Sequence, residues 1–178
     1  ERSWAGIFMS FQYPIEIPGV TITNFMKTAV NAKRAAEGLE PMKAGDFPKL
    51  MKEKMAFVQM RPEFAKREVN VGFSGGEKKR NEILQLLMLE PKLALLDETD
   101  SGLDVDAVQI VSEGVAKFHN EGNSCLIITH NTRILEKLTV DRVHVLMNGT
   151  IVEEGGAELI DDINRRGFTH ILDAQAEK

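Results

Sequence analysis

An α/β fold built on a parallel sheet is the architecture that this sequence predicts, and two observations predict it. Three short apolar runs, at residues 93–96, 126–129 and 143–147, are separated by segments with helical periodicity. Strands that alternate with helices indicate a parallel sheet with crossover helices. The composition agrees, because 178 residues with 43% hydrophobic and 28% charged residues suit one soluble globular domain.

The first half of the chain is expected to contain one strand and two helices. An apolar stretch at residues 7–11 predicts a strand, and Pro14 and Pro18 force the segment after it to be extended. Apolar residues then recur at helical spacing over residues 20–37 and 48–60. The methionines of these helices fit either an irregular core or a partner surface, and core filling is the interpretation we prefer.

A hairpin is expected near the end of the chain. Asn148-Gly149 stands between two strand-like segments, residues 143–147 and 150–153. This dipeptide favours an antiparallel hairpin, because the mirror-image turn needs positive φ at both central positions. We expect the hairpin at the edge of the sheet, and we expect the charged residues 174–178 to be frayed.

The bulk properties exclude several classes of function. No apolar run approaches the ~18 residues that a membrane-spanning helix needs. A net charge of -5 argues against nucleic acid as the main partner, although Lys78, Lys79 and Arg80 leave a local basic patch open. Cys125 is the single cysteine, so it forms no internal disulfide; we expect it in a buried strand and the protein in a reducing cytoplasm.

Two adjacent carboxylates follow the apolar run at residues 93–96, which we expect to be a strand buried on both faces. Ligands of open α/β sheets bind at the carboxyl ends of the strands. In phosphoryl transfer an acid at this position holds Mg²⁺, and a neighbouring carboxylate orients or deprotonates the attacking water. Asp97 is therefore the candidate metal ligand and Glu98 the candidate base. Acids also begin loops for solubility alone.

A helix start with two glycines is the second candidate site. Ser74 and Glu77 have the spacing of a capping box before a strongly apolar helical pattern. Gly75 and Gly76 leave the backbone amides at this start uncovered, and with the helix dipole those amides suit an anionic phosphate. A well-capped helix and a phosphate site are compatible with each other.

His130 follows the apolar run at residues 126–129 and is the third candidate. Its imidazole is suited to hydrogen-bond a terminal phosphate or the attacking water. A lone histidine in this position is also common as an ordinary polar strand end. Whether His130 has a functional role therefore depends on the residues that surround it in the fold.

Five short motifs follow one another along the chain, and their order resembles the ABC-type ATPase family. The correspondences are Gln12 to the Q-loop, residues 73–77 to the signature loop, Asp97-Glu98 to the end of Walker B, Asp104 to the D-loop and His130 to the switch histidine. Residues 11–20, 70–81 and 97–104 further resemble the SufC branch of the family. Transporter ATPases more often place Pro-Thr after the Asp-Glu pair, where this chain has Thr99-Asp100.

The resemblance implies a P-loop NTPase-like parallel sheet with an inserted helical subdomain. Its regions would be residues 1–19 around the Q-loop, residues 20–72 as the helical subdomain, and residues 73–178 with the remaining motifs. No Gly-x-x-x-x-Gly-Lys sequence followed by Ser or Thr occurs here, and no glycine precedes a lysine. The family's Walker A loop precedes the Q-loop, so we expect the sequence, which begins at Glu1, to be N-terminally truncated.

The resemblance also implies a mechanism. Glu98 and His130 would be catalytic, and Asp97 with Gln12 would hold Mg²⁺. ATP would be contacted by the residues that the family's motifs assign to it, namely Gln12, Ser74, Gly75, Gly76 and Asp104. Two chains would pair head to tail with ATP between them, and the pair would act on a cytoplasmic scaffold of SufB and SufD type in iron–sulphur cluster assembly. The alternatives are a transporter motor and a non-hydrolysing binding remnant.

Overall fold

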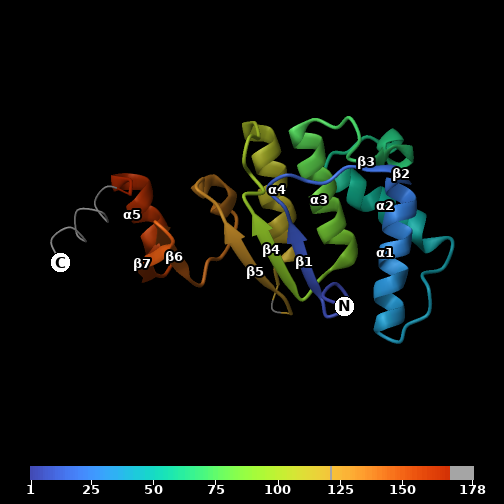
Figure 1. The fold of residues 1–178 in the computed structure, drawn as a ribbon, viewed down its shortest axis with the longest axis horizontal. Helices are drawn as coiled ribbons and strands as arrows, with labels where there is room; N and C mark the ends of the chain where they lie inside the picture. The colour runs from blue at the N-terminus through green and yellow to red at the C-terminus, as the bar shows by residue number, and fades with distance from the viewer. Residues whose placement is uncertain (121, 169–178) are drawn as a thin grey trace. The chain divides into compact units, whose positions relative to one another are not determined.

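A computed structural model describes residues 1–120 and 122–168 (Figure 1). The chain divides into two compact units, Glu1–Ile134 and Leu135–Lys178. None of the helices in the described part has the length and hydropathy that crossing a bilayer requires. The prediction for residues 174–178 lies outside the described residues, and the division into regions 1–19, 20–72 and 73–178 stays a prediction.

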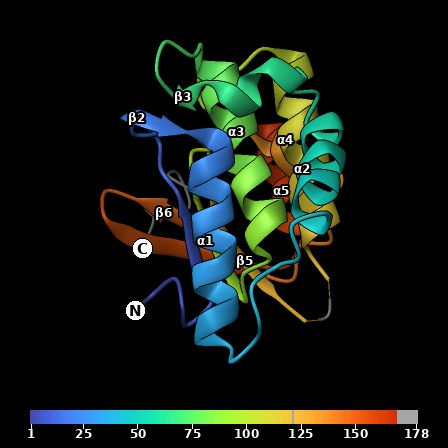
Figure 2. The ribbon, with the colours of Figure 1, turned by 90° about the vertical axis from the view of Figure 1, so that its right-hand side faces the viewer.

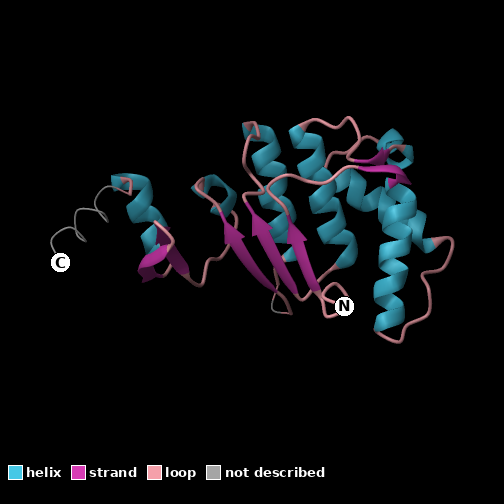
Figure 3. Cartoon of the chain, viewed as in Figure 1, coloured by secondary structure: helices cyan, strands magenta, loops and turns pink. Residues whose placement is uncertain are grey.

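A three-stranded parallel sheet forms the centre of the first unit (Figures 1 and 3). Its order is β1 (Ile7–Ser10), β4 (Leu93–Asp97) and β5 (Ser124–Ile128). Both neighbouring pairs are parallel, and Leu95 pairs with Met9 on one side and with Leu126 on the other. The predicted parallel sheet is confirmed, although β6 of the second unit is not one of its strands.

The two faces of this sheet differ in burial. Ala94 and Leu96 point to one face and are almost fully buried. Leu126 and Ile128 lie on the other face and are each 54% exposed. Strands alternate their side chains between faces, so the pattern is that of a sheet covered on one side only. The sequence predicted that residues 93–96 are buried on both faces. Leu93 and Leu95 are only half-buried, so within the described residues that prediction is wrong.

Two helices cover the buried face and pack closely on each other. They are α3 (Gly75–Leu89) and α4 (Val105–Phe118). Ile83 of α3 is fully buried, and its Cγ2 methyl occupies the space that a Cβ at Gly114 of α4 would need. The glycine therefore permits the close approach of the two helices.

The middle of the chain is helical, as predicted. α1 (Ile22–Ala36) and α2 (Asp46–Phe57) lie alongside α3 in Figure 2. Met26, Met51 and Met55 of these helices are at most 4% exposed. The methionines fill the core, and the interpretation that we preferred is confirmed.

The structure contains one small sheet that the sequence did not predict. β2 (Ile17–Thr21) pairs antiparallel with β3 (Glu68–Val69), so the helix expected from residue 20 begins two residues later, at Ile22. Pro18 and Gly19 interrupt the first strand and the second has two residues, so neither carries the alternating pattern that predicts a strand. Two short 3₁₀ segments, η1 (Pro62–Lys66) and η2 (Thr132–Leu135), complete the connections.

The second unit contains the predicted hairpin. β6 (Val143–Met147) and β7 (Thr150–Gly155) pair antiparallel in a sheet of their own, followed by α5 (Glu158–Arg166). Asn148 and Gly149 have φ values of 49° and 78°. The positive φ at both turn positions is what the Asn-Gly sequence predicted.

The thiol of Cys125 is expected to make the stability of the fold depend on pH. The thiol is half-buried in β5, and burial raises its pKa from 9.0 to about 11. Above pH 9 the unfolded chain loses this proton before the folded chain does, so the folded state binds more protons and stability falls as pH rises between 9 and 11. Urea unfolding from pH 7 to 11 should show a smaller loss for Cys125→Ala than for the parent. Equal losses in both proteins would contradict the assignment.

Candidate functional site

Three candidate residues meet at the carboxyl ends of the parallel strands. Gln12 follows β1, Glu98 follows β4 and His130 follows β5. The Gln12 side-chain amide donates from Nε2 to Glu98 Oε2 over 2.5 Å. His130 Nδ1 lies 3.9 Å from Glu98 Oε1, which is close but beyond hydrogen-bonding distance. The structure therefore brings together the glutamine, the carboxylate and the imidazole that the sequence singled out.

The backbone at Glu98 has an unusual conformation. Its φ is 43°, in the left-handed region that costs a residue with a Cβ roughly 1–2 kcal/mol. The Glu98 N–H donates to the Ile128 carbonyl over 2.9 Å, and the Glu98 carbonyl accepts from Ser101 over 3.0 Å. The strand thus ends in a tight turn that fixes the direction of the carboxylate. Strained residues of this kind cluster at functional sites, which supports a role for Glu98.

The carboxylate and imidazole are both accessible to a ligand. The Glu98 side chain is 29% exposed and that of His130 is 69% exposed. A carboxylate held by a neutral amide on one side retains an oxygen that is able to accept a proton or a hydrogen bond from water. The arrangement suits a general base with a hydrogen-bonding group beside it.

Asp97 ends β4 on the open face of the sheet, where its register partner is Ile128. Among the described residues, no three His, Cys, Asp or Glu side chains gather in the way a metal cage requires. Mg²⁺ does not depend on such a cage, because it is usually held by one or two carboxylates, by substrate phosphates and by water. The oxygen donors of Asp97 and Gln12 fit this hard cation chemically, and their metal role stays a prediction.

The glycine-containing helix start has the predicted cap. Glu77 N–H donates to Ser74 Oγ over 3.3 Å, and Ser74 N–H donates to the Glu77 carboxylate over 2.8 Å. A Cβ at Gly75 would meet nothing within 4 Å, and one at Gly76 would meet only Ala107 at 3.8 Å. The space beside Gly75 and Gly76 is therefore open, as the close approach of a phosphate to a helix start requires.

Asp104 begins α4 beside this helix start. Its Oδ1 accepts a hydrogen bond from the Ala107 N–H over 2.8 Å, so the carboxylate caps the helix. Ala107 is the residue that faces Gly76. The starts of α3 and α4 are thus neighbours, and the structure groups Ser74, Gly75, Gly76 and Asp104 there. Contact of these residues with a nucleotide stays a prediction.

The loop after Gln12 is held by polar contacts and presents apolar side chains outward. Asn70 Nδ2 donates to the Ile15 carbonyl over 2.8 Å, and Lys78 Nζ contacts Glu16 Oε1 at 2.7 Å. The side chains of Tyr13 and Ile15 are nevertheless 81% and 68% exposed. A fixed loop that exposes two large apolar groups is a candidate contact surface.

Lys78, Lys79 and Arg80 do not form the basic patch that the sequence allowed. Lys79 is buried at 3% exposure, and Lys78 is paired with Glu16. Like charges spaced one residue apart on a helix point in different directions, so Lys78, Lys79 and Arg80 do not form one exposed cluster.

Sequence reasoning missed a buried polar cluster behind the site. Ser10, Glu82 and Thr99 are at most 5% exposed, and Lys79 joins them. One signal was available, because Ser10 is a polar residue at a strand position whose alternation faces the core.

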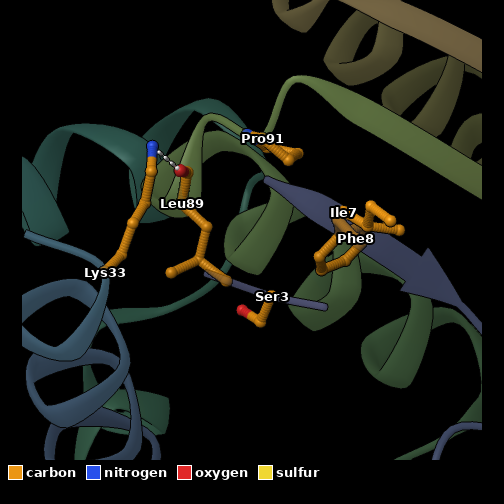
Figure 4. A pocket seen from close by; sticks show the side chains of 6 residues that line it. All are labelled: Ser3, Ile7, Phe8, Lys33, Leu89 and Pro91. Carbon is orange, nitrogen blue, oxygen red and sulfur yellow. Dashed lines mark hydrogen bonds between the residues drawn. The ribbon is translucent and has the colours of Figure 1, made fainter. Parts of the chain in front are cut away.

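A small pocket lies at the opposite end of β1 (Figure 4). Its lining includes Ile7, at the start of the strand, and Lys33 of α1. The ammonium of Lys33 is held by the carbonyls of Leu89 and Glu90 at the end of α3, at 2.7 and 3.0 Å. Lysine in this position caps the last carbonyls of a helix, which is a structural role.

Comparison with known proteins gives consistent matches. A family model described as "ABC transporter" matches residues 5–101. A probable ATP-dependent transporter of Synechocystis is 52% identical over 175 residues, covering 98% of this chain and 68% of that protein. The probable ATP-dependent transporter SufC of Escherichia coli is 47% identical over 175 residues, covering 98% of this chain and 71% of that protein.

Comparison of the fold with solved structures leads to the same family. A dimeric bacterial ABC transporter cassette superposes with a TM-score of 0.71 at 20% identity, over 87% of this chain and 64% of that one. This chain therefore spans about two thirds of the length of the proteins that it matches. The parallel sheet, the inserted helices and the sequence matches agree, and the chain belongs to the ABC-type ATPase family, among relatives of SufC type.

Proposed function

We propose that the protein containing these residues is an ATP-binding and ATP-hydrolysing subunit that drives a conformational change in a scaffold for iron–sulphur cluster assembly. The observation that carries the proposal is the contact of Gln12 with Glu98 beside His130 at the carboxyl ends of the sheet. Family membership supports ATP as the nucleotide, since the relatives are named ATP-dependent. We propose a cytoplasmic location.

In the proposed reaction, Glu98 accepts a proton from the water that attacks the γ-phosphate. Gln12, joined to Glu98 through its amide, orients that carboxylate, and His130 hydrogen-bonds the terminal phosphate. Asp97 and Gln12 would hold Mg²⁺, which would neutralise phosphate charge.

A second copy of the chain completes the site in this proposal. Ser74 Oγ and the amides of Gly75 and Gly76 would donate to the γ-phosphate across a head-to-tail dimer, with Asp104 beside them. The open space beside Gly75 and Gly76 at the start of α3 supports this role. Donors placed around developing charge act best once water is excluded, so closure of the dimer would start catalysis.

The scaffold role is supported by the similarity to SufC and by the exposed loop after Gln12. A transporter motor is the alternative, because the relatives are also named transporters. Purification of the tagged gene product from its own cells separates the two. SufB- and SufD-type scaffold proteins in the eluate, together with Mg²⁺-dependent phosphate release from ATP, would support the proposal, whereas a membrane permease would support the alternative. A product that binds ATP without hydrolysing it would favour the binding remnant.

Ile15→Glu is expected to abolish copurification of the scaffold while the chain keeps its fold. The side chain is 68% exposed, so a charge there disturbs no core packing. Ile17 is less suitable, because it pairs with Val69 in the small sheet. Leu39→Glu is a matched control, since Leu39 is 49% exposed and lies outside the loop. Retained scaffold with Ile15→Glu, or equal loss with Leu39→Glu, would refute the contact surface.

A further inference from the structure

A buried polar cluster lies on the covered face of the sheet, directly behind Gln12 and Glu98. Its members, which we call the buried clamp, are Ser10, Lys79, Glu82 and Thr99. Polar and charged groups are costly to bury unless each has a partner. Here every member is hydrogen-bonded, and the bonds lead to the two chain positions that flank the candidate site.

The first end of the clamp holds the peptide groups before Gln12. Glu82 Oε1 accepts the Phe11 N–H over 3.0 Å, and Lys79 Nζ donates to the Phe11 carbonyl over 2.5 Å. Lys79 Nζ also lies 3.1 Å from Glu82 Oε2, so the two side chains hold each other. The residue that precedes Gln12 is thus fixed at both its donor and its acceptor.

The second end of the clamp holds the residue after Glu98. Thr99 Oγ1 donates to Ser10 Oγ over 3.1 Å, and Ser10 Oγ donates to Glu82 Oε2 over 2.7 Å. Thr99 is fully buried, so its hydroxyl has no access to water as a substitute partner. One continuous set of bonds therefore runs from Phe11 through Glu82 and Ser10 to Thr99.

We propose that the buried clamp positions Gln12 and Glu98 against each other, with Ser10 as its central link. Its members are buried, and they act through the backbone of Phe11 and the side-chain hydroxyl of Thr99. A buried ion pair is weak evidence for added stability, whereas a fixed network of side chains defines one geometry for the groups it holds. The importance of this geometry for hydrolysis rests on the proposed function, but the geometry itself is measurable without it.

Two serines allow a matched test. Ser10 and Ser112 are both buried, and each donates one hydrogen bond, Ser112 to the Ile134 carbonyl over 2.9 Å. Ser10→Ala breaks the clamp, and Ser112→Ala removes a buried serine hydroxyl elsewhere in the same unit. Both variants should lose thermal stability, Ser10→Ala the more because its hydroxyl takes part in two bonds, one of them to a carboxylate. A property that changes in Ser10→Ala but not in Ser112→Ala then reports the positioning of Gln12 and Glu98, and not a general loss of stability.

The first readout is the side-chain amide resonance of Gln12 in a ¹⁵N–¹H spectrum, assigned by its loss in Gln12→Ala. We expect it to shift in Ser10→Ala and to stay unchanged in Ser112→Ala. The second readout is steady-state ATP hydrolysis by the full gene product. Ser10→Ala should lower kcat by about ten- to a hundred-fold with little change in KM, the effect of misplacing a reacting group without touching the substrate.

A second pair of variants covers the outcome in which Ser10→Ala does not fold. Thr99→Ser keeps the hydroxyl, so the Gln12 resonance and kcat should equal those of the parent. Thr99→Val removes the hydroxyl at nearly equal volume, so the Gln12 resonance should shift and kcat should fall. An unmoved Gln12 resonance in Ser10→Ala and Thr99→Val would overturn the proposal. A shifted resonance in a protein that never hydrolyses ATP would instead keep the clamp and overturn the proposed function.

Discussion

Glu98→Gln is expected to lower the rate of ATP hydrolysis by about 10²- to 10⁴-fold, the range that a positioned general base contributes. Glutamine has the shape of glutamate but accepts no proton from water at neutral pH. Because Gln12 donates to Glu98 Oε2, the amide oxygen of the new side chain is able to keep that bond. Binding of ATP and nucleotide-dependent pairing should therefore persist. Phosphate release and size-exclusion chromatography with ATP measure the two properties.

Mixing two inactive variants gives the sharpest control on this prediction. Glu98→Gln removes the proposed base, and Ser74→Arg places a large side chain at the start of α3, where the partner's phosphate is proposed to bind. If each site draws on two chains, an equal mixture contains mixed dimers with one intact site, and about a quarter of the sites should recover. No recovery would mean that base and helix start serve the same chain. Undiminished hydrolysis by Glu98→Gln alone would show that Glu98 is not the base.

Gly114→Ala is expected to destabilise the fold by about 1–3 kcal/mol, the usual cost of overpacking a core. A Cβ at this position would overlap the Cγ2 methyl of Ile83, which is fully buried in α3. The change should destabilise although alanine is favoured over glycine in a helix by roughly 1 kcal/mol. Urea unfolding measures the difference in the free energy of unfolding.

Two control variants test whether the contact with Ile83 is the cause. Gly45→Ala adds a Cβ that meets nothing within 4 Å, at a φ of -84°, and should cost less than Gly114→Ala, although Gly45 is the N-cap of α2, where glycine is preferred to alanine. The double variant Gly114→Ala with Ile83→Leu removes the Cγ2 methyl and should be less destabilised than the sum of its single changes. Additive effects would exclude the overlap as the cause.

The meeting of Gln12, Glu98 and His130 was predictable from the sequence. Each follows an apolar run, and the carboxyl ends of parallel strands share one edge of a sheet. The buried clamp was not predictable in this way. Lys79 and Glu82 stand in a charged helical stretch that has the composition of a solvated surface, and their burial follows from where the chain after β1 crosses α3.

The open face of the sheet also differs from what the sequence indicates. Leu126 and Ile128 are apolar in a run that is typical of a strand covered on both sides. The sequence pattern shows how hydrophobic each face of a strand is. Whether that face is buried depends on which other segments of the fold pack against it. The roles of Asp97 and Asp104 with ligands stay predictions, because oxygen chemistry alone serves capping and metal binding equally well.

The distances along the chain between the groups of the site determine when they come together during folding. Gln12 and Glu98 are 86 residues apart, and Ser10 is separated from Glu82 by 72 residues and from Thr99 by 89. Contacts of this range form after local structure, because loop-closure entropy opposes them until much of the chain is compact. During refolding, the local helices α1 and α2 should therefore return before Gln12 reaches Glu98. A newly made chain accordingly becomes helical before it acquires the geometry of the candidate site.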